Sequence, residues 1–170
     1  MEIAMLPYEL MAALSADERL ADVELIREYP GRETAFIRHK SLVTVGVSAF
    51  EVAQPGISGY LGRFENNGAK EEYFGRKLSV DYILTVFCPQ NLGGEGCSNI
   101  FLNISSVLID NAAGLWVKSI RAGQTEYNPN LDTYTLKITL TAEYFAANIP
   151  DKSDDVRSVT VIKNEENEIE

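Results

Sequence analysis

Alternation of apolar and polar residues predicts most of the secondary structure of this chain. Three stretches, at residues 34–52, 77–89 and 133–144, show the period-two pattern of a half-buried strand. A shorter fourth strand is expected between the last two, at residues 116–122. The stretch 133–144 is the most regular, because every second residue from Tyr134 to Tyr144 is apolar. That regularity predicts an antiparallel sheet with one face in water.

A helical period replaces the alternation between residues 89 and 114. An amphipathic helix is predicted there, after a glycine-rich turn at 93–97, and Gly114 is placed to end it. Its apolar stripe consists of Cys97, Ile100, Phe101, Ile104, Val107 and Leu108. The stripe would cover one face of a sheet.

Residues 6–25 form an N-terminal helical segment in this interpretation. Ser15 and Glu18 have the S-x-x-E form of a capping box, which predicts a break near Ser15 and a short second helix. A short strand is expected just after that helix, at Val23–Ile26. The segment precedes the regular part of the sheet.

Taken in chain order, the core elements are strand, strand, helix, strand, strand. We therefore predict an α+β fold: a mostly antiparallel four-stranded sheet (β-β-α-β-β) with one main helix packed on one face. Residues 1–150 are expected to form this single domain, and 151–170 a C-terminal extension. No internal repeat is present.

Residues 54–75 are predicted to be a long loop, because Pro, Gly and Asn recur along them. A loop of this length in a compact domain is usually functional or disordered. The loop and its end carry five large apolar residues, namely Tyr60, Leu61, Phe64, Tyr73 and Phe74. Such a concentration predicts a surface that contacts another molecule. The alternative is that the loop folds back on the chain's own core.

The extension 151–170 holds seven acidic and three basic residues and is expected to be disordered on its own. Within it, the segment 156–162 (VRSVTVI) has a strong tendency to form a strand. Val159 and Val161 are therefore candidate interface residues, in a strand added to a sheet edge of this chain or of a neighbour.

Composition limits the partners. The chain has 170 residues and a formal net charge of −10, which argues against duplex nucleic acid or an anionic membrane as the main partner. No run of apolar residues is long enough for a spanning helix, and no basic residue precedes Arg19, as a secretory signal would require.

Candidate chemistry is sparse. Cys88 and Cys97 are predicted to be reduced packing residues, although one loop disulfide is the alternative. His39 lies between two cations and has no motif that links it to Cys97. A single His and the lack of a C-x-x-C pair argue against zinc. We expect no catalytic residue, no metal and no cofactor.

The glycine-rich turn GGEGC at 93–97 precedes a helix, where phosphate can bind. It matches neither glycine-rich phosphate-binding motif, and Glu95 would repel an anion. A tight turn from strand to helix is the better interpretation. Adjacent carboxylates such as Glu71 and Glu72 point apart on a regular element and are interpreted as solvated charges.

Three parts of the sequence carry a family resemblance: ETAFIRHKSLVTVGV at 33–47, YFGRKLSVDYILTVFCPQNLGGEGC at 73–97, and the helix, strand and strand that follow through Tyr144. Over residues 6–147 the chain resembles the tail terminator (tail completion) proteins of long-tailed phages and phage-like particles. The fold of that family is a helix-backed sheet, which agrees with the pattern above.

The resemblance implies a structural virion protein. It implies a homo-oligomeric ring, commonly a hexamer, that caps the tail tube, ends its polymerisation and provides the head-joining surface. The implied partners are copies of the chain, the tail tube protein and a head–tail connector or neck protein. Membrane is not a partner, and DNA is only passing cargo. The implied location is the neck-proximal end of the virion tail, with assembly in the host cytoplasm.

Under this resemblance, segments 54–76 and 151–170 would make ring or tube contacts. Two alternatives stay open. One is a different head–tail connector or neck protein of a phage particle. The other is a small cytosolic hydrolase that uses Cys97 with His39.

Overall fold

The computed structural model describes residues 6–27, 40–53, 59–66, 69–110, 115–148 and 159–162. Its helical elements are α1 (Leu6–Ser15), the 3₁₀ turns η2 (Glu18–Leu20) and η4 (Gln90–Leu92), and α2 (Gly93–Ile109). Its strands are β1 (Val23–Arg27), β2 (Ser41–Ala53), β3 (Tyr60–Asn66), β4 (Ala69–Pro89), β5 (Trp116–Asn128), β6 (Thr133–Asn148) and β7 (Val159–Ile162).

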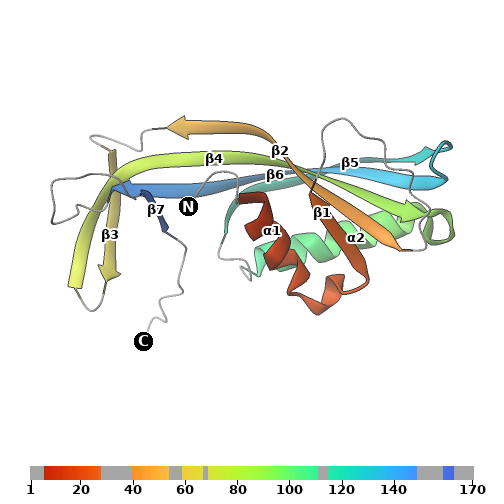
Figure 1. Cartoon of the computed structure of the whole chain (residues 1–170), viewed down its shortest axis with the longest axis horizontal. Coiled ribbons are helices and arrows are strands. Elements are labelled where there is room, and N and C mark those ends of the chain that lie inside the picture. Colours follow the sequence, from red (N-terminus) through yellow and green to blue (C-terminus); the bar gives the residue numbers. More distant parts are fainter. Residues whose placement is uncertain are drawn as a thin grey trace.

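All these strands belong to one sheet built around the long antiparallel pair β4 and β6 (Figure 1). On its outer side, each central strand pairs with two shorter strands, one along each part of its length. β2 and β3 pair with β4, whereas β5 and β7 pair with β6. β1 lies beside the first part of β2. The molecule is therefore long in the strand direction.

The predicted fold class was correct in outline and wrong in detail. The α+β class and the order β2, β4, α2, β5, β6 are present, but the sheet has seven strands rather than four. It is also mixed, because β1 runs parallel to β2. Alternation of side chains reports which residues share a face, and it does not report strand direction.

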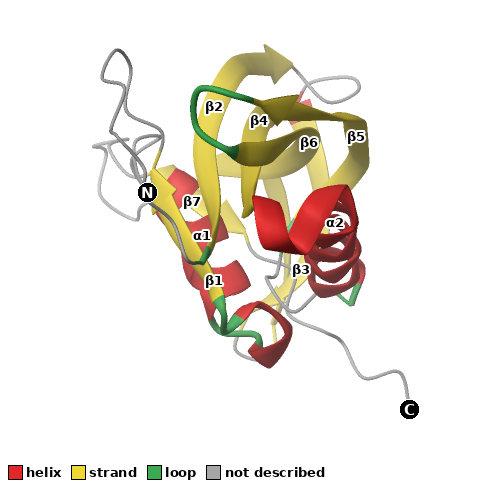
Figure 2. Ribbon diagram, turned by 90° about the vertical axis from the view of Figure 1, so that its right-hand side faces the viewer, coloured by secondary structure: helices red, strands yellow, loops and turns green. Residues whose placement is uncertain are grey.

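Both helices pack on the same face of the sheet and at the same end of it (Figures 1 and 2). α1 buries Leu6, Leu10 and Leu14. Of the predicted stripe on α2, five residues are buried and Phe101 is half-buried. They meet alternate residues of the central strands, which are Val80, Tyr82, Leu84 and Val86 of β4 and Leu136, Ile138, Leu140 and Ala142 of β6. The stripe prediction is confirmed.

The strands extend beyond their predicted ends. The predicted loop 54–75 is mostly wrong, because β3 and the first part of β4 form an antiparallel hairpin there. Gly59 and Gly62 have positive φ values of 72° and 136°, and the register of β3 shifts between Tyr60 and Gly62. Glycines that accommodate an irregular strand therefore resembled loop glycines in the sequence.

β5 continues to Asn128, although its predicted end was residue 122. Bulges between Val117 and Ser119 and between Ala122 and Thr125 interrupt the alternation, while the pairing with β6 continues. Residues 34–39 and 54–58 of the predicted extended and loop segments lie outside the described residues.

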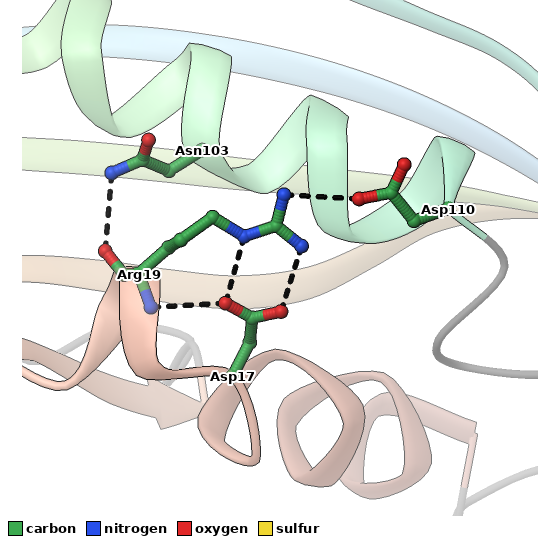
Figure 3. A network of polar contacts seen from close by, with 4 residues as sticks. All are labelled: Asp17, Arg19, Asn103 and Asp110. Atoms are coloured by element: carbon green, nitrogen blue, oxygen red, sulfur yellow. Dashed lines mark hydrogen bonds and ion pairs between the residues drawn. The ribbon is translucent and has the colours of Figure 1, made fainter.

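A polar cluster joins the N-terminal segment to the end of α2 (Figure 3). The Arg19 guanidinium donates to both carboxylate oxygens of Asp17, at 2.8 Å each, and to Asp110 Oδ2 at 3.0 Å. Asn103 Nδ2 donates to the Arg19 carbonyl oxygen at 3.1 Å. A cation beside the C-terminal end of a helix is also favourable for the helix dipole. The cluster thus holds η2 against α2.

Asp17, rather than Ser15, caps the second helical turn. Its carboxylate accepts a hydrogen bond from the Arg19 backbone N–H at 2.9 Å, whereas Ser15 Oγ donates back to the Ala12 carbonyl. The predicted capping box at Ser15 is therefore wrong, although α1 does end at that residue. Within the described parts of the chain, no helix has the length and apolar character to cross a membrane.

We expect the carboxyl of Asp17 to titrate well below its usual range. Hydrogen bonds from Arg19 lower its pKa from 3.8 to about 2. The stabilisation from ionised Asp17 is therefore complete above pH ~4 and is lost as the pH falls through about 2. An NMR titration of the Asp17 carboxyl carbon measures this. The Arg19→Leu variant should move the midpoint back toward 3.8, and Glu18→Gln should leave it unchanged. A midpoint near 3.8 in the unmodified protein would contradict the cluster.

We expect the buried side of α2 to dominate stability. Ile104 is fully buried, so Ile104→Ala should lower the free energy of unfolding by about 3 kcal/mol. The matched variant on the same helix is Leu102→Ala, whose residue is 58% exposed and which should change it by less than about 0.5 kcal/mol. Urea denaturation measures both. Equal losses would contradict the packing described here.

Candidate interaction surface

The sheet is much longer than the helix that covers it. The 17 residues of α2 span about 25 Å at the helical rise, whereas the 21 residues of β4 span about 70 Å at the strand rise. α1 and α2 lie under one end, so the other end of the sheet has no helix beneath it among the described residues (Figure 1). We call this uncovered end, formed by 48–53 of β2, β3, 69–79 of β4, 145–148 of β6 and β7, the overhang.

Four large apolar side chains are exposed on the overhang and form what we call the overhang patch. They are Phe50 (49% exposed), Val52 (58%), Tyr60 (43%) and Phe74 (45%). Phe50 pairs with Val80 and Val52 pairs with Leu78, so both lie on the face that the helices cover elsewhere. The patch therefore continues the apolar face of the core beyond the end of the helix layer.

Tyr60 and Phe74 hold the outer part of the overhang patch together. They are paired across β3 and β4, and their rings meet edge to face with centroids 5.5 Å apart. Aromatic pairs of this kind supply rigid contact area at protein interfaces, where little side-chain entropy is lost on binding. Both residues were among the predicted interface candidates, and their part in an interface stays a prediction.

The other predicted interface residues lie on the same overhang. Leu61 follows Tyr60 on β3 and is half-buried. Phe64 and Tyr73 occupy register positions opposite Glu71 and Gly62. Val159 and Val161 lie in β7, paired with Asn148 and Ala146 of β6. The side chains of Phe64, Tyr73, Val159 and Val161 lie outside what the structure describes.

Phe50 and Val52 were not among the predicted interface candidates. The alternation of 43–50 placed Phe50 on the face opposite Val43, Val45, Val47 and Ala49, but a bulge between Val47 and Ala49 turns Phe50 and Val52 to the face that the helices cover elsewhere. Their exposure follows from the reach of the helices, which is a property of the packed molecule. The available signal was the strand's length, because a single helix cannot cover the whole of it.

The opposite face of the sheet is charged and also carries aromatic rings. Lys77 Nζ lies 2.7 Å from Glu143 Oε2, and Lys118 Nζ lies 3.5 Å from Glu143 Oε1. Thr141 Oγ1 donates to Asp81 Oδ1 at 2.7 Å. On the same face the rings of Trp116 and Phe145 meet edge to face with centroids 4.7 Å apart, and Trp116 is 38% exposed. The two faces thus differ in their ion pairs, although each exposes aromatic side chains.

The candidate chemical residues are placed for packing. Cys88 and Cys97 are free and fully buried, at the end of β4 and in the first turn of α2. A Cβ at Gly96 would lie 2.8 Å from Leu92 Cβ and 3.6 Å from Cys88 Sγ, so the glycine lets the helix approach the strand. Gly93, with a positive φ of 62°, is the first residue of α2. The turn from strand to helix is η4, so the prediction of a turn at 93–97 is wrong: the GGEGC segment forms the start of the helix itself.

The two thiols influence each other. Hydrogen bonding from Cys97, and secondly from Ser41, lowers the pKa of Cys88 to about 7 against the opposing effect of burial. The same contact and burial raise the pKa of Cys97. His39, the proposed partner of Cys97 in the hydrolase alternative, lies outside the described residues. Among the residues that the structure describes, no three potential metal ligands gather.

Comparison with known proteins gives a likeness in structure alone. No family model matches the chain, and no curated protein does either. A solved structure that does match belongs to an extracellular contractile injection system. It is the PVC sheath/tube terminator in the extended state, determined by cryo-EM. The sequence identity is 13% and the TM-score is 0.43, with 100% of this chain and 65% of that chain covered. The chain thus spans about two thirds of that protein's length, and the likeness is coarse.

We expect Cys97→Ala to raise the pKa of Cys88. The substitution removes the principal hydrogen bond to the Cys88 thiolate while burial still disfavours the charge, so the pKa should rise from about 7 to above the ordinary 9.0. Ultraviolet absorbance of the thiolate against pH measures this. Ser41→Ala removes only the second hydrogen bond and should give a smaller rise. An unchanged titration in Cys97→Ala would contradict the described contact.

Proposed function

We propose that this protein is a structural component of a phage or phage-like particle that forms a ring on the end of the tail tube. The ring ends tube polymerisation and provides the surface to which the head joins. The sequence resemblance over residues 6–147 motivates the proposal. The observation that carries it is the overhang patch, in which Phe50, Val52, Tyr60 and Phe74 are exposed on one uncovered end of the sheet.

A protein that stops a polymer needs two unlike surfaces. One must match the growing end, and the other must not offer the same site again. This chain has such a polarity along its strands, because one end has a helix layer and the other presents the overhang patch. We assign the outer part of the patch, Tyr60 and Phe74, to the tail tube and the helix-covered end to the head side.

The remaining features of the proposal follow from this role. Its partners are further copies of the chain in a ring, in a hexamer by analogy with the resembling family, the tail tube protein, and a connector or neck protein. The particle would place it at the neck-proximal end of the tail, and DNA would pass without binding. The net charge of −10 supports this last point, since an acidic channel repels DNA. No catalysis or cofactor enters the role.

The proposal is tested with purified protein and the tail tube protein of the same particle. We expect light scattering to give a mass that is a multiple of 18.9 kDa when tubes are present. Tubes should stop growing when the protein is added. Tyr60→Ser with Phe74→Ser should weaken tube binding at least tenfold, because exposed aromatic residues often dominate interfaces.

A matched control is available on α2. Leu102 (58% exposed) and Ile109 (73%) are apolar residues outside the overhang patch, and Leu102→Ser with Ile109→Ser should leave tube binding unchanged. A strict monomer that leaves tube growth unaffected would overturn the proposed function.

A further inference from the structure

Two edges of the sheet have backbone groups that pair with no described strand. β1 pairs with β2 only at Ser41–Val45, so the outer edge of β2 is open from residue 46 to residue 53. β5 pairs with β6 on one side, and its other side is open along the described residues. An open strand edge is a template for pairing with another strand.

The two open stretches lie at the same position along the strand direction, as the cross-strand register shows. Ala49 of β2 is opposite Asp81 of β4, which is opposite Thr141 of β6, which is opposite Ser119 of β5. In the same way, Glu51 of β2 is in line with Ser79, Glu143 and Trp116 of the next three strands. Residues 49–53 of β2 and 116–121 of β5 are therefore opposite edges of the same section of the molecule.

The strand directions also suit pairing between copies. β2, β4, β6 and β5 are related by three successive antiparallel steps, so β2 and β5 run in opposite directions. In a ring, every copy has the same orientation relative to the axis, and β5 of one copy would meet β2 of the next as an antiparallel pair. The contact is heterologous, as a closed ring requires.

The side chains on the two edges are complementary on both faces. On the helix-covered face, Phe50 and Val52 of β2 would extend the apolar row that contains Val117 and Ile120 of β5. On the polar face, Glu51 is exposed on β2, and β5 presents Trp116 at the same position along the strands with the exposed Lys118 close to it. Opposite charges on adjacent strands support pairing, whereas like charges oppose it.

We propose that residues 49–53 of β2 in one copy pair antiparallel with residues 116–121 of β5 in the next copy, so that the sheet continues from subunit to subunit. The inference rests on the proposed function, because it names the contact that closes the ring. The partner is a second copy of this chain. Its β5 edge suits the β2 edge because the two lie at the same position along the strands, run in opposite directions, and carry apolar side chains on one face and opposite charges on the other.

A cysteine pair tests the contact directly. In one chain, the strands that carry residues 49 and 119 are separated by three strand spacings, about 14 Å, which is too far for a disulfide. Residues 49 and 119 lie at the same level of the sheet, so Ala49→Cys with Ser119→Cys should cross-link only between copies, and mild oxidation of the assembled protein should give a ladder that ends in a covalent ring. The matched control is Ala49→Cys with Glu126→Cys, which places the second thiol farther along β5 and should give no ladder.

Charge reversal supplies a second readout. Glu51→Lys should weaken self-association about tenfold through repulsion from Lys118, and adding Lys118→Glu should recover most of that loss. Circular dichroism of each variant checks the fold. If the unmodified protein forms rings but the cysteine pair gives no ladder, the edge contact is overturned while the ring function survives. If the unmodified protein forms no ring with tubes present, both proposals fail.

Discussion

The difference in rise between a strand and a helix determines how this molecule is divided. A strand advances about twice as far per residue as a helix. The 21 residues of β4 therefore extend well beyond the 17 residues of α2 that pack against it. Past the end of the helix the same face keeps Leu78 and Phe74 of β4, now alternating with the charged Arg76, so a face that is core at one end becomes surface at the other. The packed core and the overhang patch have this single origin.

Much of the fold was predictable, because burial of alternate residues is encoded locally. The stripe of α2, the alternating faces of β4 and β6, and that of β2 as far as Val47 follow directly from side-chain order. The predictions that were wrong concern features that the alternation of side chains does not encode. The bulges of β5 ended its pattern early, positive-φ glycines made β3 resemble a loop, and the parallel direction of β1 has no local signature.

The candidate surface was only half predictable for the same reason. Tyr60 and Phe74 attracted notice because they are large apolar residues in a glycine-rich segment, and the hairpin register then brings their rings together. Phe50 and Val52 were missed because the alternation put Phe50 on the opposite face, and the bulge between Val47 and Ala49 that turns both residues to the helix side has no local signature. The thiols of Cys88 and Cys97 meet because the turn after Pro89 folds α2 back onto β4, a proximity that their spacing along the chain left open.

The continuous pairing of β4 with β6 has a mechanical consequence. These strands are matched over 16 positions, from Phe74 with Asn148 to Pro89 with Thr133, and the same two strands run through both ends of the molecule. A pull directed along them loads this whole ladder of hydrogen bonds in shear, so the bonds share the force and do not open one after another. A tension applied at the hairpin would thus reach the helix-covered end through one stiff ribbon, without passing through a hinge.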